Sequence, residues 1–427
     1  MTKKIFILLL TVLPALANAQ LKGWTEKIND KVKNKTTARI DKKIDHTIDD
    51  KLDIIEGKKQ PAKKIEVSQE NRGDTSIAGK KLYVKYDFIP GEEVIYSNDF
   101  TTDNMGELPT GWNSNGTGAV VTLDAFSGNW MQFYQNTAYL TDNTVSFTEN
   151  YTVEFDLVLR RTNPKAPFPE LTWGVLSSGS LSPGDNALLK NYTATFATEM
   201  NIQPSENSNA SVHLQTFANG TVYLKTDIKK PVARVQTFNE IIHIAMQVQK
   251  ERLRIWFNEE KLYDLPKAIV SGANINQLYF IVKRYGGPEE EVSYAINNIK
   301  IAKGLPDTRH KLLEEGKFST TGIRFHVNSA VLLPESNGVL REIAAILAKN
   351  PELKINIIGH TDNDGDEAAN LELSKKRAGS VKQSLINDYR IDVGRMQTEG
   401  AGEQNPVSDN NTKEGKANNR RVEFVKL

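Results

Sequence analysis

The spacing of hydrophobic residues changes along the chain, and each spacing predicts a different structure. Near the N-terminus, apolar residues or threonine recur every four positions, with lysine and aspartate between them, at Ile28, Val32, Thr36, Ile40, Ile44, Ile48 and Leu52. A four-residue repeat slightly overshoots one helical turn, so the stripe drifts around the helix axis. Residues 20–57 are therefore predicted to form a charged helix, either a solvated spacer or a weak self-association or docking helix.

The segments on either side of this helix carry different signals. Lys3 and Lys4 precede an apolar run over residues 5–13, and Ala17-Asn18-Ala19 follows it. A basic start, a short apolar run and a small-x-small sequence are typical of a secretory signal peptide, which we predict over residues 1–19. Residues 58–82 are rich in lysine, with scattered glycine and a proline. They are predicted to be a linker.

From residue 83 to 303 the apolar residues alternate in short runs that end at glycine, asparagine or proline. Val153, Phe155 and Leu157 alternate with Glu154 and Asp156, which predicts a strand with one buried face. Asn219-Gly220 separates two further runs, and this dipeptide suits a hairpin turn in which both residues take positive φ. Many short strands joined in this way predict an all-β sandwich of two sheets. A membrane-spanning sheet stays open as an alternative, although many runs are shorter than the roughly 9 to 11 residues that such strands need.

The sandwich segment also resembles the concanavalin-like jelly rolls of bacterial surface proteins. The passages that carry this resemblance are Asp99-Phe100, residues 108–112 (LPTGW) and residues 294–299 (YAINNI). Some proteins of that broad fold are glycanases with three carboxylates on one strand, of which two act as nucleophile and acid. Here Glu154 and Asp156 are followed by Leu157, Val158 and Leu159. Because the third carboxylate is missing, we do not expect an enzyme.

Composition adds few constraints. The chain has 427 residues, a formal net charge of +1 and no cysteine. This length allows two or three domains, and the absence of cysteine excludes disulfide bonds. The net charge selects no partner, and we expect no nucleic acid ligand.

After a connector over residues 304–316, strands and helices alternate. Ile323, Phe325 and Val327 predict a first strand, and Leu353, Ile355 and Ile357 a second. Apolar residues spaced as in a helix lie between them, a long helix is predicted from about Glu367 to Asp388, and two more strands lie near residues 396–399 and 422–425. Residues 317–427 are therefore predicted to be an α+β domain of order βαβαββ. The whole chain is therefore predicted to be a multidomain protein with an N-terminal helix, a jelly-roll-like sandwich and this domain.

Five motifs of residues 317–427 resemble the OmpA-like C-terminal domain in the same order. They are residues 325–330 (FHVNSA), Gly359-His360-Thr361-Asp362-x-x-Gly365, Asn370-x-x-Leu373-Ser374-x-x-Arg377-Ala378, Gly400-x-Gly402-Glu403-x-x-Pro406 and residues 418–423 (NNRRVE). The resemblance implies non-covalent binding of the meso-diaminopimelate residue in the peptidoglycan stem peptide. It also implies a location in the periplasm or associated with the outer membrane.

The chemistry of these residues suits that ligand. The free end of diaminopimelate carries an ammonium and a carboxylate, which call for one anion and one planar cation in the site. Asp362 is the predicted anion and Arg377 the predicted cation, unless the two simply pair with each other as a surface salt bridge. Thr361 and Asn370 are predicted polar contacts. Of Arg420 and Arg421, one should line the site or pair with a carboxylate such as Glu403, and the other should face solvent; we assign Arg420 to the site.

His360 is a further candidate because histidine can bind metal or act as a base. No second histidine or cysteine stands at ligand spacing. A structural role at the end of a strand is expected instead, with no metal and no cofactor. The sequence thus predicts a non-catalytic envelope protein that tethers itself to peptidoglycan, with outer membrane proteins or a glycan as further candidate partners of the sandwich. The alternative is a surface adhesin or glycan-binding protein that uses the C-terminal domain as its anchor.

Overall fold

The structure is a computed structural model that describes residues 86–205, 211–226, 238–284 and 286–427. Residues Lys81–Leu427 form one compact unit. The predicted signal peptide, charged helix and linker lie outside the described residues and stay predictions. Among the described helices, none is both long enough and apolar enough to cross a membrane.

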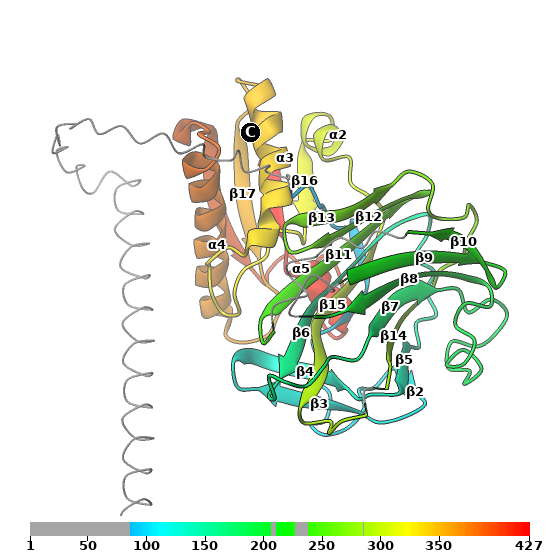
Figure 1. Ribbon diagram of the computed structural model, residues 1–427. Coiled ribbons are helices and arrows are strands. Elements are labelled where there is room, and N and C mark those ends of the chain that lie inside the picture. Colours follow the sequence, from blue (N-terminus) through cyan, green and yellow to red (C-terminus); the bar gives the residue numbers. More distant parts are fainter. Residues whose placement is uncertain (1–85, 206–210, 227–237, 285) are drawn as a thin grey trace, which may run out of the picture. The chain divides into compact units, whose positions relative to one another are not determined.

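Two large antiparallel sheets make up the middle of the chain (Figure 1). The first has the strand order β13-β12-β11-β6-β15-β4-β3, and β1 pairs with β15. Its strands are β1 (Glu93–Asn98), β3 (Gly118–Leu123), β4 (Phe126–Phe133), β6 (Asn150–Arg161), β11 (Ile241–Gln249), β12 (Arg252–Phe257), β13 (Glu260–Leu265) and β15 (Val292–Lys303). The second sheet has the order β10-β9-β8-β7-β14-β5-β2. Its strands are β2 (Trp112–Ser114), β5 (Thr137–Thr141), β7 (Leu171–Leu176), β8 (Phe196–Gln203), β9 (Ser211–Ala218), β10 (Thr221–Lys225) and β14 (Gln277–Val282).

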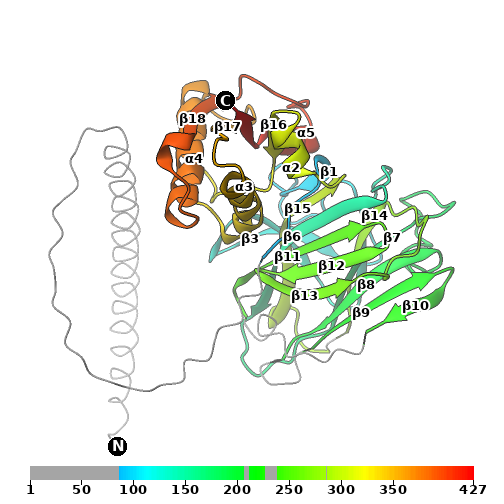
Figure 2. The same ribbon diagram turned by 90° about the horizontal axis from the view of Figure 1, so that it is seen from above.

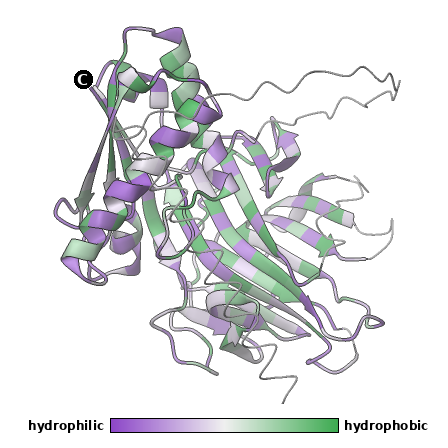
Figure 3. Ribbon diagram, turned by 90° about the vertical axis from the view of Figure 1, so that its left-hand side faces the viewer, coloured by the Kyte–Doolittle hydropathy of each residue, from purple (hydrophilic) through white to green (hydrophobic). Residues whose placement is uncertain are grey.

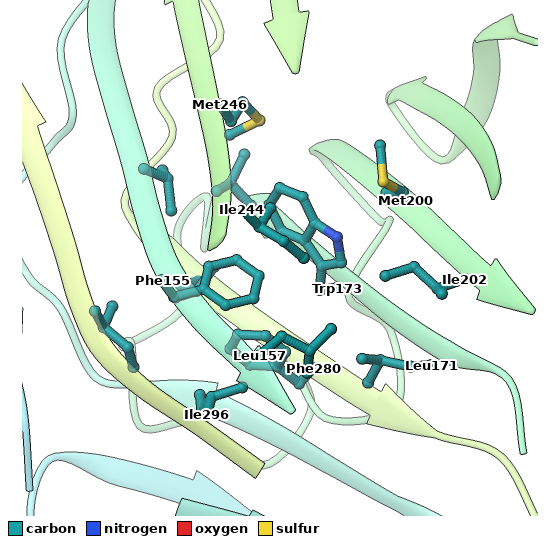
Figure 4. Packing of buried hydrophobic residues seen from close by; sticks show 14 of the residues in the cluster. Phe155, Leu157, Leu171, Trp173, Met200, Ile202, Ile244, Met246, Phe280 and Ile296 are labelled. Atoms are coloured by element: carbon teal, nitrogen blue, oxygen red, sulfur yellow. The ribbon is translucent and has the colours of Figure 1, made fainter. Parts of the chain in front are cut away.

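The two sheets share one hydrophobic core. Phe155 of the first sheet packs edge-on against Trp173 and Phe280 of the second, with ring centroids 5.0 and 5.3 Å apart (Figure 4). All three rings are at most 1% exposed. Aromatic pairs with this geometry bury a large apolar area and contribute beyond it, so they hold the sheets together.

Local sequence signals in these sheets have the predicted effect. Asn219 and Gly220 take φ values of 50° and 75° and join β9 to β10, which confirms the hairpin. Green and purple segments alternate along several strands in Figure 3, as a sheet with two different faces requires. Val153, Phe155 and Leu157 point into the core as predicted, but Glu154 and Asp156 on the opposite face are buried too, at 3% and 6% exposure.

The C-terminal part is a four-stranded sheet with helices. Its strand order is β16-β19-β17-β18, and β17 and β18 are parallel. The strands are β16 (Lys317–Thr320), β17 (Ile355–His360), β18 (Met396–Gly402) and β19 (Val422–Lys426). The helices are α2 (Thr308–Leu313), α3 (Asn337–Lys349), α4 (Glu367–Asn387) and α5 (Lys413–Asn419), with short 3₁₀ turns η2 (Pro334–Ser336) and η3 (Val393–Arg395). Apolar side chains of α3 and α4, including Ile343, Val381 and Leu385, share a second core with β17 and β19.

The first strand of this sheet is not where the sequence predicts it. β16 ends at Thr320, and the alternating residues from Ile323 to Val327 follow it as a segment that turns back on itself. Phe325 bridges to Leu332, Asn328 takes a positive φ of 52°, and Val327 is 75% exposed. The alternation was misleading because the three apolar side chains do not share a buried face: Ile323 is buried, Phe325 is partly buried and Val327 is exposed.

The structure therefore agrees with part of the fold prediction. A large β-sheet-rich middle region and an α+β C-terminal region are both present. The jelly-roll assignment and the domain boundaries stay predictions.

Candidate functional site

Asp362 lies in the loop that leaves the C-terminal end of β17. Its carboxylate is only 9% exposed and accepts a hydrogen bond from Arg420 Nη1, with Asp362 Oδ2 at 2.5 Å from this nitrogen. Its other oxygen, Oδ1, accepts from the backbone amide of Asp364 at 3.2 Å. Asp362 thus pairs with Arg420 and not with Arg377, so the simple Asp362–Arg377 salt bridge considered from the sequence is not formed.

Arg377 comes from the middle of α4 and reaches a different loop. Its Nε donates to the backbone oxygen of Ser329 at 3.0 Å, and its guanidinium lies 5.0 Å from the centre of the Phe325 ring. Burial and the neighbouring Arg420 lower the pKa of Arg377, while Asp362 raises it. In the described part of the chain, Arg377 forms no ion pair with a carboxylate. Two arginines therefore lie near the Asp362 carboxylate, and only Arg420 is paired with it.

Asn370 holds together the loop between Asp362 and α4. Its side-chain amide donates to the backbone oxygen of Asp364 at 3.0 Å and to Glu403 Oε2 at 2.7 Å. Gly365 takes a φ of 98°, a backbone conformation that residues with a Cβ rarely adopt. Asn370 is 7% exposed, so it shapes this loop from within.

Thr361 and His360 precede Asp362 and are also buried, each at 5% exposure. The Thr361 hydroxyl has no hydrogen-bond partner among the described residues. A buried hydroxyl without a partner costs free energy, which a ligand or a water molecule could recover. His360 Nε2 lies 3.6 Å from Glu423 Oε1, and neither ring nitrogen has a hydrogen-bond partner among the described residues. The structural role expected for His360 stays a prediction.

The predicted solvent exposure of Arg421 is wrong. Arg421 is 5% exposed, and its guanidinium donates to Glu423 Oε1 at 2.7 and 2.9 Å. Burial alone would raise the pKa of Glu423, but His360, Lys317 and Arg421 together hold it well below its usual value. Arg420 is the C-cap residue of α5 and Arg421 lies just before β19, and their side chains leave this turn in different directions. Arg420 reaches the loop site, while Arg421 joins a buried ionic cluster.

The structure brings Asp362, Arg420 and Arg377 into one neighbourhood, with Thr361 and Asn370 beneath the loop. Phe325 and Ser329 complete it, and neither was predicted as a site residue from the sequence. Both belong to the first of the five motifs, but neither carries a charge or a spacing signal. Their roles depend on a ring surface and a backbone oxygen, which side-chain chemistry alone does not indicate.

This region is an α+β domain with a half-buried charged site between the end of a parallel strand and a long helix. Residues 324–420 match the OmpA family, so the C-terminal region is an OmpA family domain. The match includes Asp362 and Arg377 and ends at Arg420.

Similar proteins share this domain. The chain is 42% identical over 103 residues to the probable lipoprotein YiaD of Escherichia coli, which covers 24% of this chain and 47% of that protein. It is 40% identical over 98 residues to the outer membrane protein Omp38 of Acinetobacter baumannii (23% and 28%). It is 37% identical over 107 residues to the peptidoglycan-binding protein ArfA of Mycobacterium bovis (24% and 31%). A solved structure of the peptidoglycan-associated lipoprotein from Burkholderia pseudomallei is 28% identical, with 26% of this chain and 89% of that chain covered and a TM-score of 0.24.

The chain spans less than two thirds of each of these three sequence relatives. Their names describe a lipoprotein, an outer membrane protein and a peptidoglycan-binding protein. These similarities concern the C-terminal domain.

Proposed function

We propose that this protein binds peptidoglycan non-covalently through its C-terminal domain and acts as a non-catalytic tether in the periplasm or at the outer membrane. The observation that carries the proposal is the charge arrangement around Asp362. One buried carboxylate is held by Arg420, and Arg377 beside them lacks a carboxylate partner among the described residues. The peptidoglycan-binding relative ArfA supports the same class of ligand.

In this proposal the ligand is the free end of meso-diaminopimelate. Its carboxylate binds to Arg377 and Arg420, because planar guanidinium groups can form paired hydrogen bonds with a carboxylate. Its ammonium binds to Asp362. The Thr361 hydroxyl supplies a further polar contact, and Asn370 keeps the loop in shape. The stacking of Arg377 on Phe325 restricts the guanidinium before the ligand arrives, which lowers the entropic cost of binding.

Co-sedimentation of the full chain with insoluble diaminopimelate-type peptidoglycan tests the proposal. Asp362→Ala and Arg377→Ala should each weaken binding by about 2 to 4 kcal/mol, because each leaves one charge of the ligand without a partner. Lys376→Ala is a matched control, because this neighbouring lysine is exposed and pairs only loosely with Glu372 at 3.8 Å. Equal pelleting of the wild type and both site variants would contradict the site assignment.

Binding to a second type of peptidoglycan distinguishes specific recognition of diaminopimelate from general attraction to the cell wall. Stem peptides with lysine at this position keep the ammonium but lack the side-chain carboxylate. The wild type should therefore prefer the diaminopimelate wall, and Arg377→Ala should lose most of this preference. The same preference in both proteins would mean that Arg377 does not read the carboxylate.

A further inference from the structure

The outer face of the eight-stranded sheet carries charged residues that the C-terminal domain covers. Glu154 and Asp156 of β6 and His243 of β11 are 3%, 6% and 1% exposed. Arg324 of the C-terminal domain reaches them, with Nη1 at 2.8 Å from His243 Nδ1 and Nη2 at 3.3 Å from Asp156 Oδ2. Lys300 of β15 contacts the same group of charges, with Nζ at 3.8 Å from Glu154 Oε1. A buried charge is stable only with such partners, so this contact fixes the position of Arg324.

Arg324 directly precedes the segment that supports Arg377. The backbone amide of Arg324 donates a hydrogen bond to the Ser336 hydroxyl at 2.9 Å, and this hydroxyl donates to the carbonyl oxygen of Arg324 at 3.0 Å. Phe325 follows with the ring on which Arg377 lies, and Ser329 supplies the backbone oxygen that Arg377 Nε binds. The sandwich therefore holds one end of the segment that orients this guanidinium.

A second contact leads to Arg420. Lys413, at the start of α5, donates to Asn98 Oδ1 at 2.9 Å and to Asp103 Oδ2 at 2.8 Å, and the Asp103 side chain is 3% exposed. Near the end of α5, the Asn418 side chain accepts from the amide of Val94 at 2.9 Å and donates to its carbonyl oxygen at 3.0 Å. Figure 2 shows α5 beside β1, which carries Val94. Arg420, which pairs with Asp362, follows two residues after Asn418.

We propose that the sandwich is a positioning part of the peptidoglycan site. Through Arg324 it orients Arg377, and through Lys413 and Asn418 it orients Arg420. This inference rests on the function proposed above and adds a role for residues of the sandwich that never touch the ligand. Cations that are held in place before the ligand binds lose less conformational freedom on binding, so loosening either contact weakens affinity.

A double-mutant cycle in the full chain tests the path from Lys413 to Arg420. Binding of a soluble, diaminopimelate-containing peptidoglycan fragment is measured by calorimetry for the wild type, Lys413→Met, Arg420→Ala and the double variant. Lys413→Met should weaken binding roughly three- to tenfold when Arg420 is present. In the Arg420→Ala background the same substitution should change affinity by less than about twofold, because Lys413 then has no cation to position.

Three further variants make the result specific. Lys413→Arg keeps the charge and should restore most of the affinity. Asn418→Ala removes the second contact of α5 and should weaken binding in the same way as Lys413→Met. It replaces Lys413→Met in the test if Lys413→Met folds poorly. Lys283→Met is the matched control, because Lys283 pairs with Glu170 at 2.5 Å in the seven-stranded sheet and should leave affinity unchanged.

The outcomes separate the two proposals. Equal losses from Lys413→Met with and without Arg420 would overturn the positioning role while leaving the binding site intact. Full affinity in both Lys413→Met and Asn418→Ala would do the same. Failure of the wild-type chain to bind the fragment at all would refute the proposed function, and the positioning role with it.

Discussion

The stability of the buried contact between the sandwich and the C-terminal domain should depend on pH through Glu154. Burial alone would disfavour its charge, but Lys300, His243 and Arg324 lower the pKa of Glu154 from its usual 4.5 to about 2. A carboxyl with a lowered pKa in the folded state stabilises the protein above its unfolded pKa, and this contribution is lost as the pH falls towards the folded pKa. The loss should therefore occur between about pH 4.5 and about pH 2.

The difference between the two pKa values corresponds to about 3 kcal/mol. Glu154→Gln removes the charge at every pH. The variant should be less stable than the wild type by up to this amount near neutral pH, and the gap should shrink as the pH falls through this window. Urea unfolding followed by tryptophan fluorescence at several pH values measures the gap, with Glu149→Gln, an exposed position, as the control. A gap of constant size from about pH 7 to about pH 3 would refute the assigned pKa shift and its cause.

Three further predictions concern packing and the backbone. Phe155→Ala should destabilise the sandwich by about 3 to 5 kcal/mol in urea unfolding, because it leaves a cavity against Trp173; a loss below about 1 kcal/mol would contradict the packing. Gly338→Ala should destabilise by about 1 to 3 kcal/mol, although alanine favours helices, because its Cβ would lie 1.9 Å from Phe88 O; a stabilised variant would show that this contact is loose. Gly220→Ala should lower the thermal midpoint, because φ is 75° there, and an unchanged midpoint would count against the turn.

The sequence predicts a helix or strand well where the spacing of its apolar residues reflects burial of one face only. The helix predicted from about Glu367 to Asp388 is α4 (Glu367–Asn387), and the predicted strands near residues 355, 396 and 422 are β17, β18 and β19. In these elements the buried face meets one core, so apolar spacing and geometry agree. The strand predicted from Ile323 to Val327 fails because β16 contributes only one large apolar side chain, Phe318, and the stronger alternation lies in the following loop.

For the candidate site, the sequence identified the charged residues but not their pairing. Asp362, Arg377 and Arg420 come together, yet Asp362 pairs with Arg420 and Arg377 lies on Phe325. Which of the two neighbouring arginines faces the loop depends on how the chain turns between the end of α5 at Asn419 and the start of β19 at Val422. Arg420 and Arg421 lie in neither a helix nor a strand, so no spacing rule assigns the directions of their side chains.

The least predictable feature is the buried charged face of β6. Alternating Glu154 and Asp156 give the same pattern as a strand with one face in water, and the sequence prediction placed them there. Arg324, 168 residues after Asp156, supplies a compensating charge for Asp156, and Lys300 and His243 are the partners of Glu154. A polar interface between two parts of one chain has the composition of a solvated surface, so alternation cannot distinguish the two. The two carboxylates that suggested an incomplete enzyme site thus belong to the charged cluster around Arg324. Arg324 in turn directly precedes the segment that contacts Arg377.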